Sequence, residues 1–218
     1  MHIPDGFLNV TTIATTYAVS SGGISYAVKE VNKQLKEKQV PLMGVVAAFI
    51  FAAQMLNFPI AGGTSGHLIG ATLAAILLGP WAAVLIMSCV LIAQCLIFQD
   101  GGLLALGANI FNMGIAAPFC GYFLYKLTTS LFGDSRKSKL IGGSIGAWGS
   151  VVVAATACAI ELAVSGASPW AIVLPAMTGI HALIGIGEGL ITAAALSVVM
   201  ATRADLWQLP KSAETSEI

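Results

Sequence analysis

The sequence contains few charged residues. Asp, Glu, Lys and Arg make up only 9% of its 218 residues, whereas a soluble domain carries about 25%. Hydrophobic residues make up 57%, and the mean hydropathy is +0.88. The formal net charge is zero, which argues against a nucleic-acid partner because such proteins need a basic face. The composition predicts an all-α polytopic membrane protein surrounded by lipid.

Several catalytic motifs are also missing. There is no G-x-x-x-x-G-K-S/T, so ATP hydrolysis by a P-loop is not predicted for this chain. There is no H-E-x-x-H, which disfavours a zincin-type protease. The four cysteines lie in apolar runs without a C-x-x-C pair, a pattern more typical of buried small hydrophobic residues than of a zinc site. We therefore predict that the chain is not an enzyme.

Seven apolar segments predict about seven transmembrane helices in a single membrane domain that covers 1–218. They are 10–28, 41–57, 67–79, 81–98, 103–126, 140–164 and 171–201. A full crossing needs about 20 residues, so the segment 67–79 is too short to cross the membrane. We expect that segment to begin in a re-entrant or interior loop at 58–66, with an ordinary external turn as the alternative.

Lysine and arginine indicate the orientation of the chain. They are confined to the first connection, the fifth connection and the tail: Lys29, Lys33, Lys36, Lys38, Lys126, Arg136, Lys137, Lys139, Arg203 and Lys211. With seven crossings these regions share one side, and the positive-inside rule makes that side the cytoplasm. The N-terminus is then outside and the tail 202–218 is cytoplasmic. Because no lysine precedes the first apolar segment, we expect no cleavable signal peptide.

The start of the chain can chelate a metal ion. The α-amine of Met1 and the amide nitrogen of His2 close a five-membered ring, and the same amide nitrogen and the His2 Nδ1 close a six-membered ring. Three coplanar nitrogens suit Ni(II) or Cu(II). Segment 1–9 is therefore expected to be inserted into the helix bundle as a metal-binding element. A frayed terminus is the alternative.

One further imidazole would complete a square of nitrogens. His67 follows a glycine-rich loop on the predicted outer side, and we expect it to be the fourth ligand. A capping or packing role is the alternative. Thr64 and Ser65 in the same loop, and Asp5 near the chain start, are expected to hold these ligands in place. Asp5 has the alternative role of a turn residue in Pro-Asp-Gly.

Ionisable groups within the apolar segments need partners, because each is unfavourable at the bilayer centre by about 2.5–3.5 kcal/mol. His181 and Glu188 lie seven residues apart and share a helix face. We expect a His–Glu pair that locks the bundle. Support of the metal ligands, or a proton relay that includes Glu161, are the alternatives.

Other small and polar residues are candidates for helix contacts. Asn109 and Asn112 share a face, where they either hold the backbone of the inserted segment or join two helices. Small residues four apart predict close packing within the bundle. These pairs are Gly142/Gly146, Gly185/Gly189 and Ala48/Ala52. For Ala48 and Ala52, docking of a partner subunit is the alternative.

Four motifs resemble the nickel/cobalt substrate-binding subunits of energy-coupling-factor transporters, the NikM/CbiM family. They are MHIPDGFL at 1–8, NFPIAGGTSGH at 57–67, LGANIFNMG at 106–114 and HALIGIGE at 181–188. The resemblance covers essentially the whole chain. It implies a seven-helix subunit in a prokaryotic cell membrane that captures Ni(II) or Co(II). It also implies ligation by the Met1 amine, the His2 amide and imidazole nitrogens and the His67 imidazole.

The resemblance further implies a transmembrane coupling subunit, two cytosolic ATPase subunits and a small accessory membrane subunit as partners. The opening with Pro4 and Asp5 is similar to the nickel branch, whereas the cobalt branch more often has Met-Glu there. Nickel is therefore the favoured substrate. A stand-alone proton-coupled permease is the alternative function, with Glu161, His181 and Glu188 carrying protons.

Overall fold

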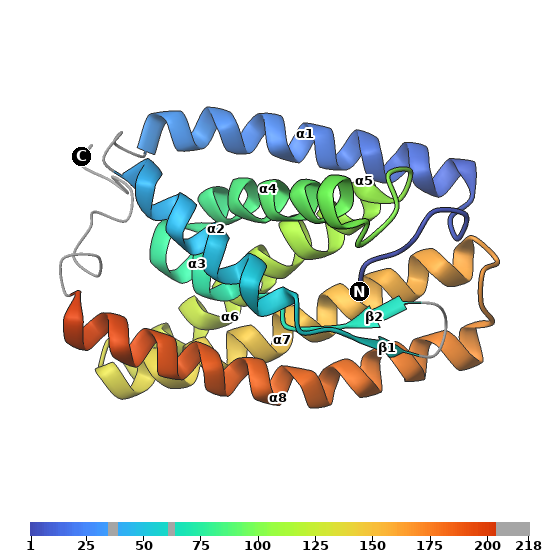
Figure 1. Ribbon diagram of the computed structural model, residues 1–218. Helices are drawn as coiled ribbons and strands as arrows, with labels where there is room; N and C mark the ends of the chain where they lie inside the picture. The colour runs from blue at the N-terminus through green and yellow to red at the C-terminus, as the bar shows by residue number, and fades with distance from the viewer. Residues whose placement is uncertain (35–38, 61–63, 204–218) are drawn as a thin grey trace.

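The computed structural model describes residues 1–34, 39–60 and 64–203. Its elements are α1 Val10–Gln34, α2 Val40–Gln54, β1 Phe58–Ile60, β2 Thr64–Gly66, α3 Ala71–Leu78, α4 Pro80–Phe98, α5 Leu106–Asn109, the π-helix η2 Ile110–Ala116, α6 Ala117–Phe132, α7 Arg136–Val164 and α8 Trp170–Thr202. The helices form one bundle, with α1 and α8 on opposite sides in Figure 1. Since α5, η2 and α6 are continuous, the described part contains seven helical stretches at the predicted places.

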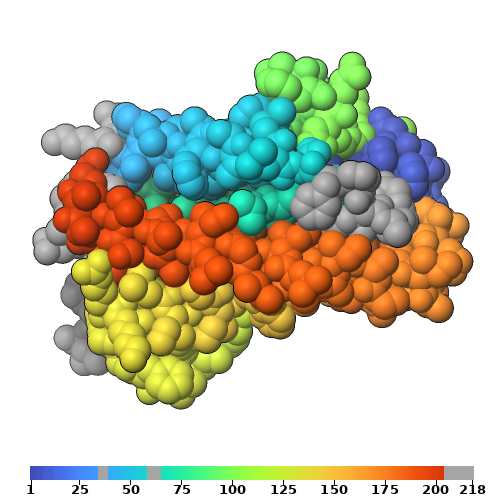
Figure 2. Space-filling view, turned by 60° about the horizontal axis from the view of Figure 1, so that its bottom comes forward, coloured from blue at the N-terminus to red at the C-terminus, as the bar shows by residue number. Residues whose placement is uncertain are grey.

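Three helices in the described part are long and apolar enough to cross a membrane, namely α4, α7 and α8. The helix α2 is apolar but has only 15 residues. The structure thus confirms a largely helical protein with apolar spans, while the number of crossings stays a prediction. The longest helix, α8, runs along the face shown in Figure 2 and is little buried by the rest of the protein, as expected of a helix that borders lipid.

The short helix α3 lies inside the bundle because it is apolar on all sides. Seven of its eight residues are buried, and it packs against α4, α6 and α7. Eight residues extend about 12 Å, so α3 cannot cross a bilayer, as the short segment 67–79 predicted. The turn into α3 requires Gly70, whose φ is +77° and whose position leaves 2.8 Å between an added Cβ and Cγ1 of Ile50.

The segment before His67 is more regular than the expected loop. The strands β1 and β2 pair antiparallel, with Phe58 opposite Gly66 and Ile60 opposite Thr64. Residues 61–63 lie outside the described part. The expectation of irregular backbone was wrong for the paired residues, because two short strands satisfy each other's peptide groups.

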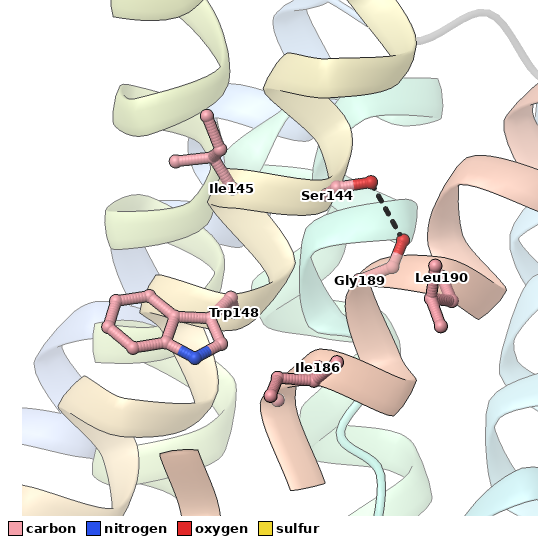
Figure 3. A pocket seen from close by; sticks show the side chains of 7 residues that line it. Ser144, Ile145, Trp148, Ile186, Gly189 and Leu190 are labelled. Atoms are coloured by element: carbon pink, nitrogen blue, oxygen red, sulfur yellow. Dashed lines mark hydrogen bonds between the residues drawn. The ribbon is translucent and has the colours of Figure 1, made fainter. Parts of the chain in front are cut away.

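Glycines allow close helix contacts, as the small-residue pattern predicted. A Cβ at Gly146 would lie 2.4 Å from the carbonyl oxygen of Gly121, and one at Gly189 would lie 3.0 Å from that of Ser144. The hydroxyl of Ser144 donates to the Gly189 carbonyl oxygen at 3.0 Å (Figure 3). An apolar pocket of about 270 Å³ opens beside this contact between α7 and α8, next to Trp148.

The helix α2 has two different faces. Val46, Ile50 and Gln54 are buried, whereas Ala48 and Ala52 are exposed. The expected internal packing of Ala48 and Ala52 was therefore wrong, because the rotation of α2 turns them away from the bundle. Their exposed position leaves this face open to a partner subunit or lipid.

Candidate metal centre

The first residues of the chain are buried inside the bundle. Met1 and Ile3 are 0% exposed and His2 is 4% exposed. In Figure 1 the N-terminus lies between helices rather than at the surface. Residues 1–3 are thus inserted rather than frayed, whereas Asp5 and Gly6 of the predicted segment 1–9 are exposed. The burial raises the question of what holds an irregular segment there.

The backbone of Ile3 is held on both sides. Its amide donates to Asn109 Oδ1 at 2.8 Å, and its carbonyl oxygen accepts from Asn109 Nδ2 at 3.2 Å and from the Gly102 amide at 2.8 Å. One amide side chain therefore satisfies both peptide groups of Ile3, as the next strand of a sheet would. The predicted role of Asn109 in holding the inserted backbone is confirmed.

The carboxylate of Asp5 holds a neighbouring loop. It accepts from the backbone amides of Leu103 at 3.1 Å, Leu104 at 2.7 Å and Ala105 at 3.3 Å. These amides belong to the loop that precedes α5, so the carboxylate satisfies backbone groups of that loop. The expected turn role of Asp5 is confirmed, since Asp5 and Gly6 form a turn in which Gly6 has a φ of +88°. The expected contact of Asp5 with a ligand imidazole was wrong, because its carboxylate binds this loop instead. The reason is that Gly102 has no side chain to keep the loop away from Asp5.

The α-amine of Met1 reaches the strand β2. It donates to the carbonyl oxygen of Ser65 and to Ser65 Oγ, the latter at 3.1 Å. Burial lowers the pKa of this amine from 8.0 to about 5, so it is neutral at pH 7 and has a free lone pair. The thiol of Cys158 lies 3.8 Å from the Met1 carbonyl oxygen. Ser65 therefore contacts a predicted ligand, whereas the side chain of Thr64 lies outside the described part.

The imidazoles of His2 and His67 lie against each other. Their ring centroids are 4.6 Å apart with 25° between the planes, and His67 is 1% exposed. Nδ1 of His67 donates to the Leu68 carbonyl oxygen at 2.7 Å, because a carbonyl oxygen only accepts. In neutral His67 the lone pair is then on Nε2, which has no hydrogen-bond partner in the described part.

His2 has two neighbours that the sequence did not point to. Its Nε2 lies 3.1 Å from Gln94 Oε1, and its Nδ1 lies 3.3 Å from Asp100 Oδ1 without forming a hydrogen bond. Burial lowers the pKa of His2 to about 3 and raises the pKa of Asp100, so this contact is not an ion pair. The only sequence signal for Gln94 is an amide inside an apolar run, which gives no partner.

Glu188 supports the turn that carries His67. Its two carboxylate oxygens accept from the amides of Ile69 at 2.6 Å and Gly70 at 2.7 Å, at the start of α3. His181 instead donates from Nδ1 to the Met177 carbonyl oxygen at 2.7 Å, and its ring also lies near the backbone of Ser65, although Nε2 forms no hydrogen bond of good geometry among the described residues. The expected His181–Glu188 pair was wrong, because seven residues on one helix face are separated by about 10 Å.

Asn112 joins two helices. Its Nδ2 donates to Glu161 Oε2 at 2.6 Å, which links η2 to α7. Asn112 Oδ1 and Glu161 Oε1 are buried and lack partners in the part of the chain described. Asn109 and Asn112 thus divide between them the two roles that the sequence left open. The π-helix widens the turn that separates them.

Comparison with known proteins identifies the family. Residues 2–206 match the family model CbiM, described as the cobalt uptake substrate-specific transmembrane region. The chain belongs to the CbiM family. This family accounts for the apolar helices and agrees with a role in transport rather than catalysis.

Relatives in the CbiM family are metal transport proteins by name. The chain is 42% identical over 208 residues to a putative fused nickel transport protein NikMN of Archaeoglobus fulgidus, covering 94% of this chain and 68% of that protein. It is 31% identical over 211 residues to the cobalt transport protein CbiM of Sorangium cellulosum, covering 94% of each. A crystal structure of a truncated transition metal transporter superposes with a TM-score of 0.86 at 40% identity, covering 92% of this chain and 99% of that one.

Proposed function

We propose that this chain captures Ni(II), or Co(II), outside the cell as the substrate-binding subunit of an ATP-driven energy-coupling-factor importer. The observation that supports this most directly is the buried chain start, with the Met1 amine beside Ser65 and the His2 ring stacked on His67. The proposed donors are the Met1 amine, the His2 amide nitrogen, His2 Nδ1 and His67 Nε2. Both ring nitrogens lack hydrogen-bond partners in the described part.

The donor set suits a late divalent transition metal. Two fused chelate rings hold three nitrogens in one plane, and the His67 imidazole supplies the fourth position. Planar nitrogen coordination suits Ni(II) and Cu(II), whereas Mg(II) prefers oxygen ligands. Copper binds such donors more tightly than nickel, so selection for nickel has to come from geometry and metal supply.

The proposed partners supply the energy for transport. The chain has no P-loop, so two cytosolic ATPase subunits would hydrolyse ATP, and a transmembrane coupling subunit would connect them to this chain. A small accessory membrane subunit is a further proposed partner. The exposed face of α2 with Ala48 and Ala52 is the proposed docking surface. The N-terminus faces outside and the C-terminus lies in the cytoplasm of a prokaryotic cell.

The identity and coordination of the bound metal test this proposal. The purified protein is incubated with equal concentrations of nickel, cobalt and zinc salts, and the bound metal is identified by mass spectrometry. We expect nickel or cobalt, and for nickel the visible spectrum of a planar diamagnetic complex. Zinc as the bound metal, or a nickel complex with an octahedral spectrum, would contradict a planar nitrogen site.

A stand-alone proton-coupled permease is the second candidate. The observation that favours it is the buried carboxyl of Glu161, one oxygen of which has no partner among the described residues. Proton-coupled carriers use such groups. Purified protein in ATP-free vesicles separates the two candidates. Metal uptake driven by a pH gradient would select the permease, and uptake only with ATP and partner subunits would select the importer.

A further inference from the structure

A chain of amide hydrogen bonds connects the main chain of Ile69 to the ring of His2. Gln54 Nε2 donates to the Ile69 carbonyl oxygen at 2.7 Å, and Gln94 Nε2 donates to Gln54 Oε1 at 3.0 Å. Gln94 Oε1 then lies 3.1 Å from His2 Nε2. Both glutamines are 0% exposed, and they come from α2 and α4. Burial of an amide side chain in an apolar helix is unfavourable unless the amide is hydrogen-bonded, and this chain gives both glutamines hydrogen-bond partners.

The carbonyl of Ile69 fixes the direction of this chain. A carbonyl oxygen only accepts, so Gln54 must point its NH₂ group toward it. Gln54 Oε1 then faces Gln94, which must donate to it from its own NH₂ group. Gln94 is left with only its oxygen for His2. The hydrogen of neutral His2 is therefore on Nε2, and the lone pair is on Nδ1.

A competing acceptor lies on the other side of the ring. Asp100 Oδ1 is 3.3 Å from His2 Nδ1. A carboxylate oxygen also only accepts, so it favours the opposite tautomer, with the hydrogen on Nδ1. In that tautomer Nδ1 has no lone pair for a metal ion. The tautomer of His2 thus depends on which of the two acceptors, Gln94 or Asp100, holds the ring hydrogen.

We propose that Gln54 and Gln94 are positioning residues that keep the hydrogen of His2 on Nε2 and so present Nδ1 to the incoming metal. The consequence for metal binding rests on the proposed function. The tautomer itself is a property of the metal-free protein. The arrangement also places Gln54 on α2, the helix whose opposite face carries the exposed Ala48 and Ala52.

Two substitutions of Gln54 separate this role from simple packing. Gln54→Glu, held as the neutral acid so that its hydroxyl donates to the Ile69 carbonyl oxygen, keeps an acceptor toward Gln94, so Gln94 keeps its orientation and His2 keeps its tautomer. Gln54→Leu removes the acceptor, so Gln94 is free to turn and the preference weakens. Gln94→Leu removes the acceptor at His2 altogether. We expect nickel affinity close to that of the wild type for Gln54→Glu and about 10- to 100-fold weaker for Gln94→Leu, with Gln54→Leu between them.

Nitrogen NMR of ¹⁵N-histidine-labelled, metal-free protein reads the tautomer directly, with the His2 signals assigned by a His2→Ala variant. We expect protonated Nε2 in the wild type and in Gln54→Glu, and a shift toward protonated Nδ1 in Gln94→Leu. Protonated Nδ1 in the wild type would overturn the proposal even if no variant folds. Equal tautomers and equal nickel affinities in Gln54→Glu and Gln54→Leu would also overturn it. A wild type with protonated Nε2 that binds no nickel would retain the tautomer assignment and refute the proposed function instead.

Discussion

The rings of His2 and His67 stack with their centroids 4.6 Å apart, although one belongs to the second residue of the chain and the other to the turn before α3. The start of the chain therefore has to be threaded between helices before the two imidazoles meet. Ile3 and Asn109 hold it there through two hydrogen bonds. Every prediction about metal binding depends on this insertion.

An added residue in front of Met1 is predicted to abolish tight nickel binding. The extension converts the α-amine into a peptide nitrogen and needs space beside Met1, which is 0% exposed. Loss of a residue that only supports a metal ligand lowers metal affinity by about 10- to 100-fold. Because the extension removes a ligand itself, we expect the affinity to fall by more than about 100-fold. Isothermal titration with nickel measures it, and the same residue added after Ile218 is the control. Unchanged affinity in the N-terminally extended protein would show that the amine is not a ligand.

Replacement of His67 by alanine is predicted to remove the fourth nitrogen. The stacked ring and its unpaired Nε2 are both lost, so the nickel complex should lose its planar spectrum and bind more than about 100-fold more weakly. His181→Ala is the matched control, because His181 is also buried with an unpaired Nε2. If His181→Ala lost the planar spectrum and His67→Ala kept it, the fourth donor would be His181.

Nickel binding is predicted to weaken in acid. Burial lowers the pKa of the Met1 amine to about 5 and that of His2 to about 3. Above pH about 5 both groups are already neutral in the folded protein, so binding releases mainly the amide proton of His2. Below pH about 5 the amine proton must also leave, and the affinity should fall more steeply. Titrations in buffers of different ionisation enthalpy count the protons, and no proton release at pH 7 would exclude the deprotonated amide as a ligand.

The same lowered pKa predicts how the metal-free protein responds to pH. The unfolded amine, with its pKa of 8.0, binds a proton over a range in which the folded amine does not. The unfolded state therefore binds more protons between pH about 5 and 8, and the folded protein gains stability as the pH rises through this window. The midpoint of thermal unfolding in detergent measures the gain. Acetylation of Met1 should flatten the dependence, and an identical slope after acetylation would assign it to other groups.

Gly102→Ala is predicted to loosen the inserted segment. The new Cβ would lie 2.1 Å from Asp5 Oδ1 and 2.3 Å from the Asp5 amide nitrogen, so the segment or the loop must move. We expect a loss of about 1–3 kcal/mol in unfolding free energy and weaker nickel binding. Gly22→Ala in α1 is the control, because a Cβ there meets nothing within 4 Å. Equal effects of the two substitutions on nickel affinity would contradict a role for the Gly102 contact.

The sequence predicted the class of fold and most helix positions, because these depend on composition and on runs of neighbouring residues. It also pointed to Met1 and His2, since chelate rings are built from atoms adjacent in the chain. The short helix α3 followed from the length of its apolar run. All of these features are local along the chain.

The sequence by itself determined that the protein is helical and apolar, and that its first two residues, Met1 and His2, can chelate a metal ion. Only the tertiary structure decided which residues surround that start: the amide chain through Gln54 and Gln94, the carboxylate of Glu188 on the turn before α3, and the link from Asn112 to Glu161. These contacts join different helices, so they depend on how each helix is rotated and how far it is shifted against its neighbours. Neither quantity can be read from the spacing of residues within one helix.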